Sequence, residues 1–248
     1  IGGRDEADTT HDKEDVSAIT TALKLGITHI DTGESYALGH AEELIGKAIN
    51  GFERKNLFIT SKVSPEHLKY DNLITSAKES LIHAPNPDIP IEETMQAMDH
   101  LVEKELIRCM GVSNFSVEQI KEAQKCTKNR IVANQIEYNL LVRDKGRVTE
   151  NMESKIIPYC QENDILIIAW RPLANGRLAK PGYKILDELS KKYNKTQAQI
   201  AINWLISKKG IVTMTKATKV VHLEENLGSI GWKLKQEDAD RLDKECMV

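Results

Sequence analysis

Four residues whose side chains can move protons follow one another in the first third of the chain. Asp31 and Tyr36 lie five residues apart, Lys62 ends an apolar run, and His83 precedes an Ala-Pro pair. Taken singly, each has an ordinary interpretation: a turn carboxylate, a loop tyrosine, a solvated lysine and a hydrogen-bonded core histidine. They form a site only if the fold brings the ends of several strands together.

Together these four side-chain types suit proton transfer to an oxygen atom. An ammonium group beside a phenol stabilises the phenolate and brings the phenol closer to acid–base work at neutral pH. A carboxylate beside the lysine offsets the cost of burying its charge. A neutral imidazole can hydrogen-bond a substrate oxygen and orient it. The set therefore suits adding a proton to a carbonyl oxygen while a hydride reaches the carbonyl carbon.

The elements that must position these residues alternate along the chain. Apolar, β-rich runs predict strands at residues 27–31, 57–62, 107–113, 131–135, 165–170 and 211–216. Helical periodicity predicts helices at 12–26, 41–49, 71–81, 91–105, 117–126, 152–163, 183–193 and 196–208, with further helical segments at the end. Strict alternation of this kind indicates a parallel sheet covered by helices.

Seven or eight βα units without a break in composition favour a single (β/α)8 TIM barrel over residues 1–248. The sequence has no GxGxxG after a strand, which counts against a Rossmann domain. In a barrel the carboxyl ends of the strands form one rim, and ligand sites are built there. Asp31 and Lys62 end predicted strands, Tyr36 follows one, and His83 ends a broken strand region, so we expect all four on that rim.

Two places depart from a complete barrel. No strand precedes the first helix, and the helix predicted over 71–81 runs directly into Ile82 without a turn. A βα barrel needs a loop and about five strand residues at the second place. We therefore expect that the first strand and the fourth-strand region are missing from the sequence, with a break between Leu81 and Ile82.

Composition excludes several classes of protein. The 248 residues are 40% hydrophobic, and 34 Lys and Arg face 37 Asp and Glu, giving a net charge of −3. This balance gives no reason to expect nucleic acid or an anionic membrane as a partner. No apolar run approaches the roughly 18–20 residues that span a bilayer, and no signal peptide is seen. Four scattered cysteines without a CxxC pair predict neither disulfides nor a metal site, so we expect a soluble cytoplasmic protein.

Seven short segments of the chain resemble signature segments of the aldo-keto reductases. They are residues 31–36, 59–62, 82–85, 111–115, 134–135, 169–173 and 215–216 with Asn226, and they follow the family order over nearly the whole chain. The resemblance implies a (β/α)8 barrel that reduces aldehydes, ketones or sugar-like substrates with a nicotinamide cofactor.

The resemblance also implies the roles of individual residues. Asp31, Tyr36, Lys62 and His83 match the catalytic tetrad, with Tyr36 as the proton donor. The residues that match cofactor positions are Ser113, Asn114 and Gln135 at the carboxamide, Trp170 as the stacking ring, Arg171, Leu173 and Asn175 at the pyrophosphate, and Lys216, Ala217, Thr218, His222, Glu225 and Asn226 at the adenosine end.

The cofactor preference depends on one departure from the family pattern. Many members that prefer the phosphorylated cofactor carry arginine where this chain has His222. Histidine is a weaker and pH-dependent cation, which leaves NAD(H) open. Lys216 and Lys219 still supply positive charge, so we expect NADP(H).

Two other functions fit parts of the pattern. The same fold serves as a non-catalytic, cofactor-binding regulatory subunit of potassium channels. A barrel aldolase could use Lys62 as a Schiff base, although Tyr36 and the adenosine-end segment would then be unexplained. For the reductase we expect a small carbonyl compound as the partner, selected by rim residues such as Glu34, 64–65, 87–88 and the segment after Asn139.

Overall fold

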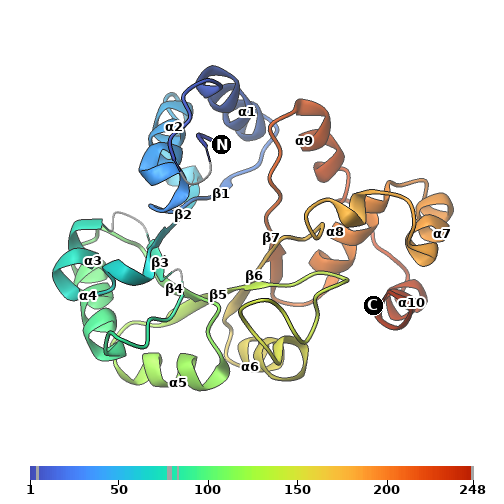
Figure 1. Ribbon diagram of the computed structural model, residues 1–248. Coiled ribbons are helices and arrows are strands. Elements are labelled where there is room, and N and C mark those ends of the chain that lie inside the picture. The colour runs from blue at the N-terminus through green and yellow to red at the C-terminus, as the bar shows by residue number, and fades with distance from the viewer. Residues whose placement is uncertain (4–5, 77–79, 83, 247–248) are drawn as a thin grey trace. The chain divides into compact units, whose positions relative to one another are not determined.

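The computed structural model describes residues 1–3, 6–76, 80–82 and 84–246, in which strands alternate with helices (Figure 1). The strands are β1 His29–Asp31, β2 Phe58–Val63, β3 Ser80–Ile82, β4 Met110–Ser113, β5 Ile131–Glu137, β6 Leu166–Trp170 and β7 Ile211–Thr213. The helices are α1 Asp12–Lys24, α2 His40–Ala48, α3 Tyr70–Ser76, α4 Ile91–Glu103, α5 Val117–Lys125, α6 Ile157–Glu162, α7 Lys184–Tyr193, α8 Gln197–Ser207, α9 Val220–Leu227 and α10 Gln236–Glu245. The predicted alternation is therefore confirmed.

The chain divides into two compact units, each with its own parallel strands. The first contains Ile1–Val132 and Ala217–Val220, and the second contains Ala133–Lys216 and Val221–Val248. In the first unit β1 pairs with β2, β2 with β3 and β3 with β4, all in parallel. In the second unit β5 pairs with β6 and β6 with β7, also in parallel. The prediction of a single domain over 1–248 stays a prediction.

Helical periodicity explains how α1 and α2 cover the first strands. Ile19 and Leu23 of α1 lie four residues apart on one face and are buried against Ile45 and Ala48 of α2 and Leu57 before β2. Residues spaced three or four apart share a helix face, so this pattern buries one apolar stripe. The two helices thereby hold the strands that carry Asp31 and Lys62.

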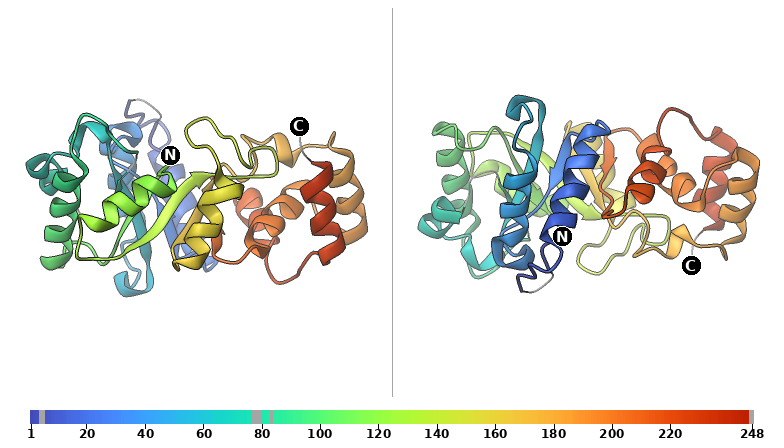
Figure 2. Two further views of the ribbon diagram at one scale, coloured as in Figure 1. Left: turned by 90° about the horizontal axis from the view of Figure 1, so that it is seen from below. Right: turned by 90° about the horizontal axis from the view of Figure 1, so that it is seen from above.

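In the second unit α7 and α10 lie side by side (Figure 2). The guanidinium group of Arg241 on α10 donates to both carboxylate oxygens of Glu188 on α7, at 2.7 and 2.9 Å. Asp238 on α10 accepts hydrogen bonds from Lys192 and Tyr193 at the end of α7. Because a bidentate Arg–carboxylate pair fixes direction as well as distance, these contacts set how the two helices meet.

The region around β3 differs from the sequence prediction. The helix predicted to continue to Leu81 ends at Ser76, and Ser80–Ile82 forms β3. Leu81 lies opposite Lys62 and Ile82 opposite Val63, so the two residues are consecutive in one strand and the predicted break between them is wrong in this structure. The described strand has three residues, and the expectation that part of the fourth-strand region is missing from the sequence stays a prediction. Pairing with β2 overrides a local pattern that favours helix.

Two further observations complete the fold. Among the described residues before α1, Gly3 and Ala7 form an isolated antiparallel bridge, and a strand is not seen there. Within the described part of the chain, every helix is too short or too polar to cross a membrane.

Asp99 provides a test of how α4 is anchored. Its carboxylate accepts hydrogen bonds from Thr127 Oγ1, from the Lys128 amide at 2.9 Å, and from the Asn129 amide and side chain at 3.2 and 2.9 Å. Burial raises the pKa of Asp99, but these hydrogen bonds outweigh it and hold the pKa below its ordinary value. A carboxyl group with a depressed pKa stabilises the fold above its unfolded-state pKa, and this contribution is lost as the pH falls through the folded value.

We expect Asp99→Asn to lower the free energy of unfolding at pH 7 by about 1–3 kcal/mol, because the turn loses its anionic acceptor. Urea unfolding at pH 7 and at acidic pH measures this, and the difference from the original protein should shrink as the pH falls below the ordinary pKa of Asp. Glu103→Gln, on the same helix with a single 3.4 Å contact to Lys128, is the control and should change little. An equal effect of both substitutions at pH 7 would contradict the assigned role of Asp99.

Candidate active site

A buried ion pair joins the ends of β1 and β2 in the first unit. The Lys62 ammonium nitrogen lies 2.6 Å from Asp31 Oδ2 and donates a second hydrogen bond of 2.6 Å to the carbonyl of Thr32. Lys62 is 1% exposed, so its charge is removed from water. Asp31 ends β1 and Lys62 lies one residue from the end of β2, which is where parallel strands bring their carboxyl ends together. The contact predicted between these two residues is confirmed.

Tyr36 lies directly beside this ion pair. The Lys62 ammonium lies 4.9 Å from the centroid of the Tyr36 ring, and the tyrosine is 38% exposed. Tyr36 begins a short 3₁₀ turn, Tyr36–Gly39, in which Ala37 and Leu38 both have φ of 53°. Left-handed backbone at two consecutive non-glycine residues is strained, and such strain is concentrated at functional sites.

Asp31 and Lys62, two members of the predicted tetrad, are therefore in contact, and the ring of the third member, Tyr36, lies beside them. The contact expected between the Tyr36 hydroxyl and the Lys62 ammonium stays a prediction. His83 lies outside the described residues. Nearby, burial lowers the pKa of His29, which hydrogen-bonds Thr60 Oγ1 at 2.9 Å, so a neutral imidazole adjoins the ion pair.

The loop that carries Tyr36 is tied to β2 and to the loop that follows it. The amide of Thr32 donates to the Thr60 carbonyl at 2.7 Å, and the amide of Glu34 donates to the Lys62 carbonyl at 3.0 Å. The Glu34 carboxylate accepts from the Ser64 amide at 2.6 Å and lies 2.9 Å from His67 Nδ1. Glu34 therefore links two rim loops, and its expected part in substrate selection stays a prediction.

Ser113 and Asn114 lie at the same edge of the first unit's strands. Ser113 ends β4 and is buried, and β4 pairs with β3 through Val112 and Ile82. Asn114 has φ of 62°, and its side-chain amide donates to Ser113 Oγ at 3.0 Å. Their predicted role toward the carboxamide of a cofactor stays a prediction, but their position at strand ends agrees with it.

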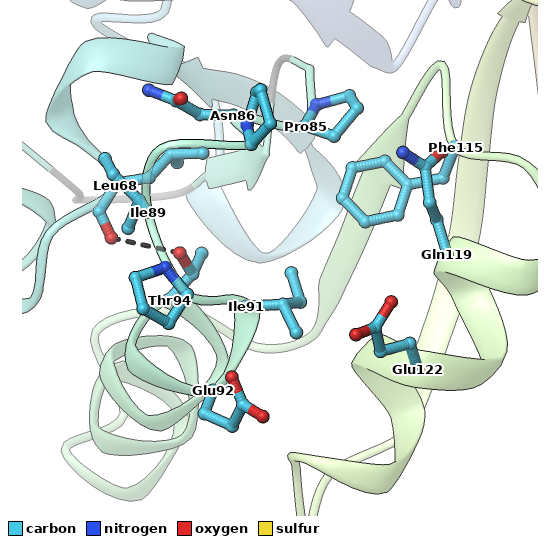
Figure 3. A pocket seen from close by; sticks show the side chains of 12 residues that line it. Leu68, Pro85, Asn86, Ile89, Ile91, Glu92, Thr94, Phe115, Gln119 and Glu122 are labelled. Atoms are coloured by element: carbon cyan, nitrogen blue, oxygen red, sulfur yellow. Dashed lines mark hydrogen bonds between the residues drawn. The ribbon is translucent and has the colours of Figure 1, made fainter.

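A separate cavity of about 410 Å³ opens between α4 and α5 (Figure 3). Apolar side chains including Leu68, Ile91 and Phe115 line it, and the carboxylates of Glu92 and Glu122 lie near one end. None of the described residues that line this cavity is a predicted catalytic or cofactor residue. Pro87, one of the rim residues expected to select the substrate, does line it.

In the second unit the ends of β5 and β6 carry a ring and a charged pair. Gln135 is buried in β5, and Trp170 ends β6. The guanidinium carbon of Arg171 lies 4.9 Å from the centroid of the Trp170 ring, and Arg171 donates to Glu137 Oε1 at 3.3 Å. An aromatic ring held at a strand end suits stacking on a flat heterocycle.

The segment after β6 bends tightly. Arg171, Ala174 and Asn175 have φ of 55°, 47° and 58°, and the carbonyl of Leu173 accepts from the Gly176 amide at 2.9 Å. Non-glycine residues in the left-handed region cost about 1–3 kcal/mol each. The predicted pyrophosphate residues Arg171, Leu173 and Asn175 therefore all belong to one strained turn, which is the kind of backbone that closely approaches a bound anion.

The residues predicted for the adenosine end lie on and before α9. Asn226 donates from its side chain to Thr215 Oγ1 at 3.0 Å, which ties α9 to the segment after β7. His222 and Glu225 are one helical turn apart, with His222 Nδ1 3.5 Å from Glu225 Oε2. Lys216, Ala217 and Thr218 form the connection to α9. Their roles stay predictions.

Sequence reasoning missed two polar residues of the second unit. Glu137 is the last residue of β5 and is buried, and Asn139 donates from its side chain to the Arg171 carbonyl at 2.9 Å. The sequence did carry a signal: polar residues recur at every second position, at Gln135, Glu137 and Asn139, beyond the predicted strand end at Gln135.

Comparisons with known proteins agree with this arrangement. The model of the Aldo/keto reductase family matches residues 2–245. The methylglyoxal reductase YeaE of Escherichia coli (strain K12) is 31% identical, over 96% of this chain and 86% of its own length. A crystal structure of the thermostable aldo-keto reductase Tm1743 with the inhibitor epalrestat is 40% identical, with a TM-score of 0.91 over 98% of this chain and 91% of that chain. An aldo-keto reductase from Klebsiella pneumoniae in complex with NADPH is 29% identical, with a TM-score of 0.83 over 98% and 89% of the two chains.

The chain belongs to the aldo-keto reductase family. The family match and the structural similarity cover both units, so the predicted (β/α)8 barrel class is confirmed. This aldo-keto reductase is accordingly an enzyme and an oxidoreductase.

The aldolase alternative does not fit the surroundings of Lys62 in this aldo-keto reductase. A Schiff base requires an uncharged amine that can attack a carbonyl carbon. The Lys62 nitrogen instead donates two hydrogen bonds of 2.6 Å, one to a carboxylate and one to a backbone carbonyl. Both contacts hold the Lys62 nitrogen against protein atoms, and it would have to leave them to attack a substrate carbon.

Gly33 tests how closely the Tyr36 loop must approach Lys62. A Cβ atom at Gly33 would lie 3.2 Å from Lys62 Cβ, and Lys62 cannot yield easily because two short hydrogen bonds fix its end. We expect Gly33→Ala to lower the free energy of unfolding by about 1–3 kcal/mol, as overpacking does. Gly46→Ala, in α2 with nothing within 4 Å, is the control and should be neutral or stabilising. Urea unfolding of both variants measures the difference, and a neutral Gly33→Ala would refute the close approach.

Proposed function

We propose that this aldo-keto reductase reduces the carbonyl group of small aldehydes or ketones to an alcohol, using NADPH, with Tyr36 as the proton donor. The observation that carries the proposal is the position of the Tyr36 ring beside the buried Lys62–Asp31 ion pair. The cofactor, when bound, supplies the hydride that reaches the carbonyl carbon.

In this proposal the chain's own residues supply the proton. As the carbonyl oxygen gains negative charge, Tyr36 gives it the hydroxyl proton, and the phenolate that remains is stabilised by the Lys62 ammonium. Asp31 holds that ammonium in place and compensates its buried charge. His83 would orient the substrate oxygen by a hydrogen bond.

The proposed use of NADPH rests on side chains that could stack on the nicotinamide, hydrogen-bond its carboxamide and bind its phosphate. The ring of Trp170 suits stacking on a nicotinamide, and Ser113, Asn114 and Gln135 offer the hydroxyl and amide groups that bind a carboxamide. Lys216 and Lys219 offer positive charge for the additional phosphate of NADPH. A relative crystallised with NADPH supports this choice, and NAD(H) is the alternative that the experiment must separate.

The names of the relatives indicate which class of substrate to test first. A methylglyoxal reductase is 31% identical over most of the chain, so a small 2-oxoaldehyde is the first substrate to test. The non-catalytic alternative predicts cofactor binding without turnover. Loss of NADPH absorbance with a panel of small aldehydes therefore decides between the two functions.

Tyr36→Phe tests the assigned proton donor. We expect it to lower the rate of carbonyl reduction by about 10²–10⁴-fold, which is the usual contribution of general acid–base catalysis. The dissociation constant of NADPH should stay nearly the same, because Tyr36 acts on the substrate oxygen. Tyr70→Phe at the start of α3 is the matched control. A Tyr36→Phe variant that keeps more than about a tenth of the original turnover would refute the assignment.

His222→Arg tests the phosphate preference. Arginine carries a permanent charge and can form two parallel hydrogen bonds to a phosphate, so we expect the ratio of NADH to NADPH dissociation constants to increase. Fluorescence titration with both cofactors measures this ratio. Gln236→Arg adds the same charge on α10 and should leave the ratio unchanged. An unchanged ratio in His222→Arg would place the phosphate elsewhere.

A further inference from the structure

A buried carboxylate at the end of β5 is not used by the proposed reaction. Glu137 is 5% exposed, and among the described residues its one ion-pair partner is Arg171, whose terminal nitrogen lies 3.3 Å from Glu137 Oε1. The amide of Arg147 also donates to Glu137 Oε2 at 3.4 Å. A buried charge of this kind is strongly unfavourable without its partner, so Glu137 constrains where the Arg171 guanidinium can lie.

Neighbouring residues hold both the backbone and the guanidinium group of Arg171. Its carbonyl accepts a hydrogen bond of 2.9 Å from the Asn139 side chain, whose own oxygen accepts from the amides of Leu141 and Val142. Its guanidinium group contacts Glu137 and lies over the Trp170 ring, 4.9 Å from the centroid. The left-handed backbone of Arg171, with φ of 55°, turns the chain at this point.

The register of the strands explains why these groups meet. Glu137 and Trp170 are direct partners across the β5–β6 ladder, and Arg171 follows Trp170. The carboxylate on one strand end therefore reaches the guanidinium group that covers the ring on the next. A guanidinium group over an indole face is a favourable cation–π contact.

The family resemblance implies that Arg171 binds the pyrophosphate, but its surroundings favour a role in holding the Trp170 ring. A carboxylate at 3.3 Å offsets most of the positive charge that a pyrophosphate would otherwise meet. If attraction of phosphate were the main role of Arg171, a buried carboxylate beside it would oppose that role. The same carboxylate is well placed if the role of Arg171 is to lie on the ring.

We propose that Glu137 is a positioning residue that holds Arg171 on one face of Trp170 and so presents the other face of the ring to the nicotinamide. The proposal rests on the proposed function. A ring whose orientation is set before binding loses less freedom when the cofactor stacks on it, so the affinity is higher. Glu137 contributes to cofactor affinity through Arg171, and it does not touch the reacting atoms.

The first measurement needs no cofactor. In protein labelled with 5-fluorotryptophan, three ¹⁹F resonances are expected from Trp170, Trp204 and Trp232, and Trp170→Phe assigns the first. We expect Glu137→Gln to shift or broaden the Trp170 resonance, while the other two stay in place. Glu150→Gln, which removes an exposed carboxylate paired with Lys145 in the same segment, is the matched control and should leave all three unchanged.

The second measurement is a double-mutant cycle on the dissociation constant of NADPH. We expect Glu137→Gln and Arg171→Gln each to raise it about tenfold, and the double variant to match Arg171→Gln alone, because Glu137 acts through Arg171. At saturating NADPH, kcat of Glu137→Gln should stay within about threefold of the original, since the lost interaction concerns cofactor binding. If Glu137→Gln does not fold, Glu137→Asp replaces it, because the shorter side chain withdraws the carboxylate and keeps the charge.

Each outcome separates the positioning role from the proposed function. Unchanged NADPH binding and an unchanged Trp170 resonance in Glu137→Gln overturn the positioning role and leave NADPH-dependent reduction intact. Additive effects in the double variant also overturn it, because Glu137 would then act independently of Arg171. Failure of the original protein to bind NADPH overturns the proposed function, and the ¹⁹F measurement still decides whether Glu137 holds the ring.

Discussion

The burial of one ammonium group is the constraint on which the arrangement of the first unit depends. Lys62 is removed from water, and a charge in such surroundings persists only if its partners are fixed. Asp31 and the Thr32 carbonyl supply those partners, both at 2.6 Å. This requirement places the end of β1 against the end of β2, and the loop to Tyr36 must then pass close over Lys62 with a glycine at position 33.

The second unit also contains a buried charge that an opposite charge compensates, but here the buried charge is negative. There the buried group is the carboxylate of Glu137, and the compensating charge is the guanidinium group of Arg171. In each unit the charged pair lies at the carboxyl ends of adjacent parallel strands and next to an aromatic ring, Tyr36 in one and Trp170 in the other. Strand ends suit this use because the backbone there is fixed by the sheet while the side chains remain at the rim.

The accuracy of the sequence predictions differs between elements for a physical reason. Periodicity identified α1, α4 and α8 nearly to the residue, because each buries an apolar stripe that recurs at helical spacing. It failed at residues 80–82, because the predicted helix continued into residues that form β3. A strand of three residues carries no periodicity of its own, and only its pairing with β2 and β4 makes it a strand.

The sequence by itself determined the family, the barrel class and the identity of Asp31, Tyr36 and Lys62 as a possible proton-transfer set, because motif order and residue type are properties of the chain. The tertiary structure decided which of these side chains touch. It placed Lys62 on Asp31, linked Glu34 to the loop after β2, and brought Glu137 to Arg171 across 34 positions of sequence. Such contacts depend on strand register and burial, which arise only when distant segments pair, so no local pattern could specify them.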